Sequence, residues 1–206
     1  MRIILGWAAF AVFHSLTVSE GYERLARRAM GERAFDVYHR LLFTGYSCVA
    51  FFLLVLYLRS LPDVSLFRVE GWPRLLLHAV QLCGAALLLW TPWDLKEFLG
   101  LRQWERRGDK SPAPRRNDRL FTGKAYGLVR HPLYLGISTI LAASPAQSRT
   151  SLVSTAMVIL YFYAGTFLEE RRLVHKFGEE YRAYQERVPR FLPVGWLFVS
   201  RRANPP

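Results

Sequence analysis

The stretch YGLVRHPLYLG, from Tyr126 to Gly136, places an ionisable pair of residues directly before a proline and an apolar run. Proline suits the first position of a helix, where its missing N–H would have no helical partner in any case. The pattern therefore predicts a helix that begins at Pro132, with Arg130 and His131 at its N-terminal end. The backbone N–H groups and the positive end of the helix dipole favour an anion at such a position.

The composition of the chain indicates a membrane protein. Its 206 residues combine a hydrophobic fraction of 51% with a formal net charge of +12, which is typical of a nucleic-acid binder or of a membrane protein with basic loops. Five apolar segments favour the membrane protein, and two of them, of about 18 residues, can cross most of a ~30 Å hydrocarbon core. We predict an all-α, polytopic integral membrane protein with about five transmembrane helices and a cytoplasmic C-terminal helix. The five segments are 3–16, 41–58, 75–90, 132–146 and 152–168.

The Lys and Arg residues are distributed unevenly between the two sides that five spans would create. One side, which includes the long third loop and the C-terminal region, carries 23 of the 28 basic residues. The positive-inside rule places that side in the cytoplasm. We therefore expect a multi-pass protein of the cell (inner) membrane, with the N-terminus outside and the C-terminus and the site in the cytoplasm. Because topology explains the basic excess, we expect membrane lipids and no nucleic acid as partners.

The chain is predicted to form one membrane domain with two regions. Residues 1–92 would form an N-terminal three-helix region, and residues 93–206 a catalytic region with a cytoplasmic loop, a helical hairpin and a C-terminal helix. Residues 106–119 are rich in proline and charge, which predicts a mobile segment, and both a lid and a plain linker fit this pattern. Cys48 and Cys83 lie inside apolar runs without the spacing of a metal site or disulfide, so we expect no metal.

A second charged segment, FLEERRLVHKFGEEYRAYQERVPRFLP (Phe167–Pro193), follows the last apolar run. The last two apolar segments predict a helical hairpin, which would bring residues 130–131 and 169–170 to the same membrane face. We expect the final helix to continue to residue 188 with one packed stripe. Glu169 extends that stripe and is predicted to point inward, whereas Glu170 lies about 100° around the helix. The stripe consists of Leu173, Phe177, Tyr181, Tyr184 and Val188.

The side chains at these two segments suit a zwitterionic ligand. They include cations, carboxylates and aromatic rings, without the motifs of hydrolases or of soluble nucleotide-binding folds. Arg130 and the helix end would bind a carboxylate, a glutamate would accept hydrogen bonds from ribose hydroxyls, and tyrosine rings would stabilise a sulfonium. A salt-bridge cluster that caps two helices is the alternative. The residues are Arg130, Arg187, Arg190, Glu169, Glu170, Tyr126, Tyr134 and Tyr181.

The segments LFTGKAYGLVRHPLYLG (Leu120–Gly136) and LEERRLVHKFGEEYRAYQERVPRFLP (Leu168–Pro193) resemble integral-membrane methyltransferases. This superfamily is typified by isoprenylcysteine carboxyl methyltransferase and the phospholipid methyltransferases. The resemblance implies an enzyme of EC 2.1.1 type that uses S-adenosyl-L-methionine, releases S-adenosyl-L-homocysteine and reaches its acceptor from the membrane.

The resemblance also implies roles for individual residues. Arg130 and Arg187 would be catalytic, because they would orient the acceptor and its developing charge. The cofactor would be bound by Tyr126, His131, Pro132, Tyr134, Gly136, Glu169 and Glu170.

Three other segments resemble the bacterial branch that includes methanethiol S-methyltransferases and NnrU proteins. They are FHS (Phe13–Ser15), WDLKEFLGLRQ (Trp93–Gln103) and ASPAQS (Ala143–Ser148). This resemblance shifts the expected acceptor from a prenylated protein toward a small or lipophilic thiol. The substrate-binding residues would then be His14, Gln103 and Arg190.

Other functions also fit the sequence. Isoprenylcysteine carboxyl or phospholipid methylation is one alternative. Sterol reductases share an HPxYxG-like stretch and bind NADPH, whose 2′-phosphate would need further arginines such as Arg115, Arg116 and Arg119. A non-catalytic, NnrU-like membrane protein is the remaining alternative.

Overall fold

The computed structural model describes residues 1–105, 107 and 119–192. The described chain is mostly helical and divides into two compact units that interleave in sequence. The first unit contains Met1–Asp63 and the described residues of Trp93–Ala113, and the second contains Val64–Pro92 and the described residues of Pro114–Pro206. The chain passes from the second unit to the first at the predicted boundary, 92–93. The division into an N-terminal region, 1–92, and a catalytic region, 93–206, remains a prediction. Apart from residues 107 and 119, the predicted lid or linker at 106–119 lies outside the described residues.

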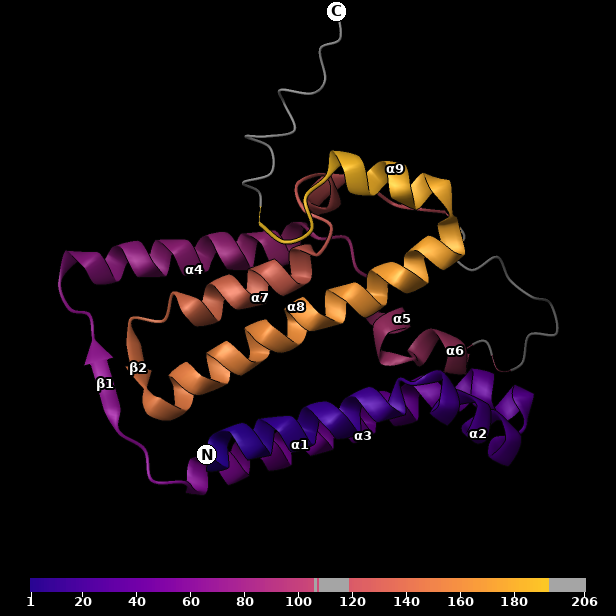
Figure 1. The fold of residues 1–206 in the computed structure, drawn as a ribbon, viewed down its shortest axis with the longest axis horizontal. Coiled ribbons are helices and arrows are strands. Elements are labelled where there is room, and N and C mark those ends of the chain that lie inside the picture. Colours follow the sequence, from indigo (N-terminus) through magenta and orange to yellow (C-terminus); the bar gives the residue numbers. More distant parts are fainter. Residues whose placement is uncertain (106, 108–118, 193–206) are drawn as a thin grey trace, which may run out of the picture. The chain divides into compact units, whose positions relative to one another are not determined.

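The first unit is built on two long helices that pack side by side and antiparallel, α1 (Arg2–Thr17) and α3 (Glu32–Ser60) (Figure 1). Near one end of the pair, a Cβ atom at Gly6 would lie 2.8 Å from a ring carbon of Tyr57, so the helices approach closely there. Toward the other end, the Nδ1 atom of His14 lies 3.2 Å from the Ser47 hydroxyl. This contact between a histidine and a serine satisfies polar groups on otherwise apolar helices.

Three shorter helices complete the first unit: α2 (Glu20–Met30), α5 (Leu95–Leu99) and α6 (Leu101–Glu105). Ser19 caps α2 by accepting a hydrogen bond from the backbone N–H of Tyr22. Gly100 joins α5 to α6 with a φ of 82°, and a Cβ atom there would lie 2.6 Å from the backbone nitrogen of Leu41. Only glycine therefore allows this turn to lie directly on α3.

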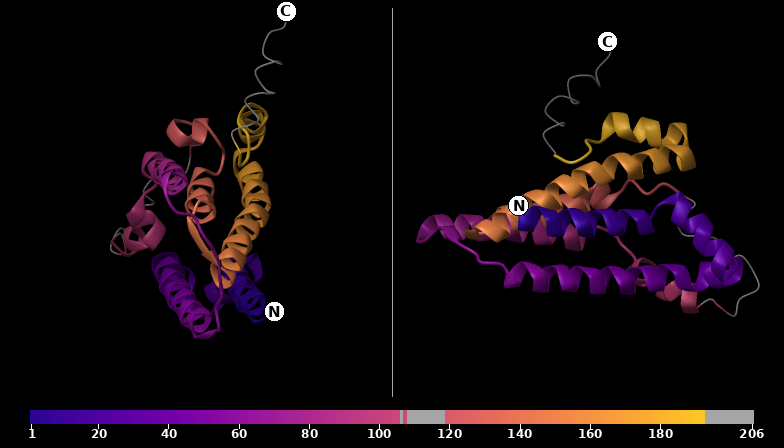
Figure 2. Two further views of the ribbon diagram at one scale, coloured as in Figure 1. Left: turned by 90° about the vertical axis from the view of Figure 1, so that its left-hand side faces the viewer. Right: turned by 60° about the horizontal axis from the view of Figure 1, so that its bottom comes forward.

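The second unit contains α4 (Trp72–Trp90), the 3₁₀ helix η3 (Lys124–Gly127), α7 (Pro132–Ala142), α8 (Arg149–Phe177) and α9 (Glu179–Arg187) (Figures 1 and 2). Its tightest contact joins α4 and α7, where Gly84 and Gly136 face each other without side chains between them. The Gln81 amide also donates a 3.0 Å hydrogen bond to the Ile140 carbonyl oxygen. Small residues and interhelical hydrogen bonds of this kind hold apolar helices together in membranes.

Two short strands accompany the helices, so the predicted all-α fold is mostly but not entirely helical. Strand β1 (Ser65–Arg68) pairs antiparallel with β2 (Ala146–Ser148), which lies in the connection between α7 and α8. Directly after β2, the Ser148 and Ser151 side chains form a reciprocal capping box that starts α8. The polar residues of this turn thus satisfy backbone groups of both a strand and a helix.

The prediction that the last helix runs unbroken to residue 188 is wrong. Helix α8 ends at Phe177, because Gly178 adopts a φ of 56° and turns the chain back into α9 (Figure 1). A glycine with positive φ is a common helix terminator. The predicted stripe nevertheless forms a core: Tyr181, Tyr184 and Val188 are buried against Leu173, Val174, Phe177 and Leu120.

Three described helices are long and apolar enough to cross a membrane: α3, α4 and α8. The bent pair α1–α2, with an angle of 57° at its break, would supply a fourth span if it crosses as one unit. The predicted span over 132–146 forms the shorter helix α7, which at ~1.5 Å per residue is only about 16 Å long. The described residues therefore contain three helices that can span a membrane, or four spans with the bent pair, and the five predicted spans remain a prediction.

Candidate functional site

The two sequence motifs of the C-terminal half meet through their backbones. The N–H of Arg130 donates to the carbonyl oxygen of Pro189 at 2.9 Å, and the N–H of His131 donates to that of Arg190 at 3.2 Å. The segment that enters α7 is thereby paired with the segment that leaves α9. Pro132 is buried at the first position of α7, as its sequence context predicts.

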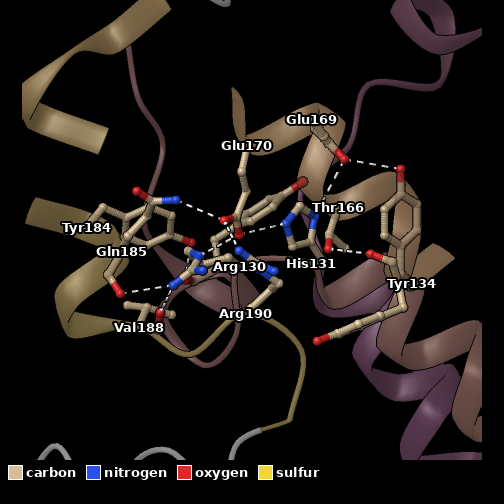
Figure 3. Close-up of polar contacts among 12 residues, drawn as sticks. Arg130, His131, Tyr134, Thr166, Glu169, Glu170, Tyr184, Gln185, Val188 and Arg190 are labelled. Carbon is tan, nitrogen blue, oxygen red and sulfur yellow. Dashed lines mark hydrogen bonds and ion pairs between the residues drawn. The ribbon is translucent and has the colours of Figure 1, made fainter. Parts of the chain in front are cut away.

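The carboxylate of Glu170 is the centre of the cluster (Figure 3). Its Oε1 atom lies 2.8 Å from Arg130 Nε and 3.2 Å from His131 Nε2, and its Oε2 atom accepts from Gln185 at 2.8 Å and Arg190 at 2.9 Å. The Glu170 side chain is only 4% exposed. A carboxylate buried to this extent is tolerated because four donors replace its lost hydration.

Arg130 is bound to protein groups through its Nε and Nη1 atoms. Besides Glu170, its Nη1 atom donates to the carbonyl oxygens of Gln185 at 2.9 Å and Val188 at 2.6 Å, at the C-terminal end of α9. A guanidinium at a helix C-terminus satisfies the last carbonyl groups and interacts favourably with the dipole. Arg130 thus caps α9 and compensates the Glu170 charge, with its side chain 7% exposed.

His131 lies between the two glutamates. Its Nε2 atom faces Glu170, and its Nδ1 atom lies 3.5 Å from Glu169 Oε2. Burial acts to lower the pKa of His131, but the hydrogen bonds and negative charges of Glu169 and Glu170 outweigh burial and raise it above its ordinary value. The imidazole ring is also parallel to that of Tyr134, with ring centroids 5.6 Å apart.

Glu169 and Tyr134 form the open edge of the cluster. The Tyr134 hydroxyl donates to Glu169 Oε2 at 3.1 Å, and the Tyr134 ring stacks on that of Phe162 at 4.7 Å. The Glu169 side chain is 47% exposed, so the predicted orientation of the two glutamates is wrong. At about 100° per residue, the packed face of α8 centres on Leu173, Val174 and Phe177, and Glu170 lies at its middle while Glu169 lies at its edge.

Tyr126 joins η3 to this cluster through its backbone. Its carbonyl oxygen accepts a 2.7 Å hydrogen bond from the hydroxyl of Tyr184, a buried residue of α9. Burial, and then the negative charge of Glu169, raise the pKa of the Tyr126 hydroxyl above its ordinary value. Gly136, by contrast, faces α4 at Gly84 and Leu88, so the structure gives it a packing contact.

The remaining cations of the C-terminal motif differ in their surroundings. Arg190 donates to Glu170, its guanidinium lies 4.0 Å from the centre of the Phe167 ring, and among the described residues no acceptor reaches its buried Nε atom. Arg187 is exposed and donates to the Ala183 carbonyl oxygen of its own helix, so it does not join the cluster.

The two predicted substrate residues of the N-terminal half belong to the first unit. His14 contacts Ser47 and stacks on Phe10, with ring centroids 5.5 Å apart. The Gln103 amide donates a 3.0 Å hydrogen bond to Glu97 between the short helices α5 and α6. Both side chains therefore have contacts inside that unit.

Gln185 is the cluster residue that the sequence prediction missed. It lies four residues after Tyr181 and one after Tyr184, so its place on the inner side of α9 could be read from the stripe spacing. The carbonyl oxygens of Gln185 and Val188, which hold Arg130, are backbone atoms and leave no residue-type signal. In the part of the chain that the structure describes, no group of three or more His, Cys, Asp or Glu residues is arranged to hold a metal ion.

Known proteins resemble the chain over most of its length. It is 30% identical to methanethiol S-methyltransferase 1 of Bradyrhizobium diazoefficiens over 92% of this chain and 65% of that protein. It is 35% identical to a methanethiol S-methyltransferase of Pseudomonas deceptionensis over 57% of this chain and 46% of that protein, and 27% identical to one of Mycobacterium tuberculosis over 93% and 76%. The chain thus spans about two thirds of the first relative's length and about half of the second's.

No solved structure shows significant similarity to the chain. The sequence model of the NnrU protein family, however, matches residues 2–192, which include every residue of the cluster described above. The chain therefore belongs to the NnrU protein family.

Proposed function

We propose that this protein is a membrane methyltransferase that uses S-adenosyl-L-methionine and methylates a small or lipophilic thiol. The names of the relatives support both the reaction class and a thiol acceptor. The single observation that carries the proposal is that the two adjacent glutamates differ in their surroundings. Glu170 accepts from four protein donors, whereas Glu169 is exposed beside Tyr134 and His131.

The residues at the open edge fit the chemical groups of this cofactor. Glu169 is an accessible acceptor for hydroxyl or ammonium groups, and Phe162, the partly exposed ring at the end of the stack, would offer an aromatic face to a cation. The Arg190 Nε–H, which no acceptor reaches among the described residues, would gain one from a carboxylate. We therefore assign the carboxylate of the cofactor to Arg190 instead of Arg130, whose Nε and Nη1 atoms already bind Glu170 and α9.

When bound, S-adenosyl-L-methionine supplies a methyl group on a positively charged sulfur, which a thiol accepts after losing its proton. The chain contributes position and charge to this reaction. His131 holds Glu169 in place through Nδ1, and the stack of His131, Tyr134 and Phe162 fixes the ring faces. Arg130 acts as a positioning residue, because its contacts fix Glu170 and the end of α9.

The membrane arrangement belongs to the same proposal. We propose a multi-pass protein of the cell membrane whose C-terminal helix and cluster face the cytoplasm, and in which the bent pair α1–α2 and the short α7 enter the membrane in addition to α3, α4 and α8. The uneven distribution of Lys and Arg supports this orientation. The roles predicted from the sequence for His14, Gln103 and Arg187 remain predictions.

The test is thermal stabilisation of the detergent-purified protein by S-adenosyl-L-homocysteine, with NADPH at matched concentration. A ligand that binds only the folded state raises stability once its concentration passes the dissociation constant. We expect a shift with the homocysteine compound alone, which Glu169→Gln weakens and Glu179→Gln, at an exposed carboxylate of α9, leaves intact. Dimethyl sulfide formed from methanethiol then identifies the acceptor.

Other results of that experiment would replace the proposal. A shift with NADPH alone would indicate a reductase. No shift with either compound would favour a non-catalytic member of the NnrU family, and cofactor binding without methylation of methanethiol would redirect the search to carboxyl or phospholipid acceptors.

A further inference from the structure

The outer face of α8 carries an exposed apolar stripe. Leu160, Ala164 and Leu168 are spaced four residues apart and are all exposed, with 61% and 58% exposure at the two leucines. Residues spaced in this way lie on one side of a helix. Because α8 is long and apolar enough to cross a membrane, this stripe is suited to contact hydrocarbon chains.

The stripe leads directly into an arc of basic residues. Arg171, Arg172, His175 and Lys176 are all exposed and fall within about 140° of one another at 100° per residue. The residues of the apolar stripe lie within about 60° of Arg171 on the same helical wheel. Along the axis, Arg172 lies about 6 Å beyond Leu168. Apolar and basic groups thus follow each other on one helix face at the spacing of a lipid tail and its headgroup.

The opposite face of this turn is used for packing. Leu173, Val174 and Phe177 are half-buried against Tyr181 and Tyr184 of α9, so the arc is the solvent-facing side. Glu169 lies at the edge of the arc, and Glu179 and Glu180 follow only after Gly178, with Glu179 paired to Arg182 at 3.2 Å. The Lys176 ammonium also lies 5.0 Å from the centre of the Phe177 ring.

We propose that this face of α8 binds an anionic phospholipid, with its acyl chains along Leu160, Ala164 and Leu168 and its phosphate at Arg171, Arg172, His175 and Lys176. Basic residues directly beyond a membrane span attract anionic headgroups in this way. The apolar stripe selects a lipid over a free phosphate, because a soluble anion gains nothing from exposed leucines. The lipid site does not depend on the proposed methyl transfer, because the experiment that tests it measures lipid binding and not methylation.

The experiment measures lipid binding to the full chain in detergent by native mass spectrometry. Phosphatidylglycerol, phosphatidylcholine and glycerol 3-phosphate are titrated separately. We expect phosphatidylglycerol to bind more tightly than phosphatidylcholine and glycerol 3-phosphate to bind least. The double variant R171Q/R172Q should weaken phosphatidylglycerol binding about tenfold, since each basic residue near a lipid surface contributes appreciably. The charge-matched control is R68Q/R182Q, which removes two exposed arginines from β1 and α9.

A second measurement requires no variant. For the unaltered chain, binding of phosphatidylglycerol should weaken as salt rises from 0.05 to 0.5 M, roughly the range over which screening shortens the Debye length severalfold. Equal binding of the two phospholipids, an equal loss in the control variant, or binding that is insensitive to salt would each overturn the proposal. Equally tight binding of glycerol 3-phosphate would indicate a site for a soluble anion instead.

Discussion

The carbonyl oxygen of Gly84 lies 2.9 Å from the position that a Cβ atom at Gly136 would occupy. Two helices, α4 and α7, therefore touch backbone to backbone at this point. The structure gives Gly136 a packing contact with Gly84 and Leu88, and its predicted contact with the cofactor remains a prediction. The contact fixes α7, and with it the position of His131 at the start of that helix.

We predict that Gly136→Ala lowers the free energy of unfolding by about 1–3 kcal/mol, as overpacking of a tight contact usually does. The added methyl group would meet backbone as well as the Leu88 side chain, so repacking one side chain cannot relieve it. Thermal unfolding in detergent measures the effect. Gly165→Ala in α8 is the matched control, because nothing lies within 4 Å of its Cβ position, and we expect it to be neutral or slightly stabilising.

Removal of the Glu170 charge should destabilise the protein strongly. In Glu170→Gln, the buried guanidinium of Arg130 loses its counter-charge, and breaking a buried ion pair on one side costs about 3–5 kcal/mol. Glu169→Gln should cost less than about 1 kcal/mol, because that side chain is half-exposed. Chemical denaturation of both variants tests this difference, and equal losses would show that the two carboxylates share the structural role.

The stability of the protein should depend on the protonation of His131. Because the pKa of His131 is raised in the folded state, the folded protein holds its proton more tightly than the unfolded chain does. The resulting stabilisation is fully present below the unfolded value of about 6.5 and is lost as pH rises through the folded value. Unfolding of the native chain and of His131→Gln across pH 6 to 9 should show the difference between them shrinking as pH rises. A difference independent of pH would contradict a charged His131.

The hydrogen bond from Tyr184 to the Tyr126 carbonyl oxygen ties α9 to η3. Tyr184→Phe should lower the free energy of unfolding by about 0.5–1.5 kcal/mol, the usual net contribution of one hydrogen bond. Tyr46→Phe, at an exposed tyrosine of α3, provides the control and should have little effect. If the two variants were equally stable, the bond would not contribute measurably in solution.

The sequence predicted features that rest on composition and local chemistry. The start of α7 at Pro132 and the packed residues Tyr181 and Tyr184 follow from proline and spacing, and both are present. Of the five predicted spans, those at 41–58, 75–90 and 152–168 lie in helices long and apolar enough to cross a membrane. The meeting of the two C-terminal motifs also followed from a helical hairpin, in which the ends of neighbouring helices come together.

Other features depended on tertiary contacts that periodicity alone does not contain. Glu169 was expected to point inward because the stripe was extended through residues of α9, across the break at Gly178. The glycine itself was the available signal for that break. Two hydrogen bonds of Arg130 are accepted by backbone carbonyl groups, which every residue type has, so the sequence could not indicate them. The pairing of β1 with β2 joins segments about 80 residues apart in sequence, which a local pattern does not predict.

Because Glu169 and Glu170 are adjacent, the rotation of α8 about its axis decides which of the two carboxylates is buried and which is exposed. Insertion of one residue between Leu168 and Glu169 would turn the upstream helix by about 100° relative to everything after it. Either the apolar stripe would leave the lipid, or Glu170 would leave its four donors and Glu169 would move toward them. An insertion in α8 next to the glutamates therefore preserves both orientations only if it adds nearly complete helical turns.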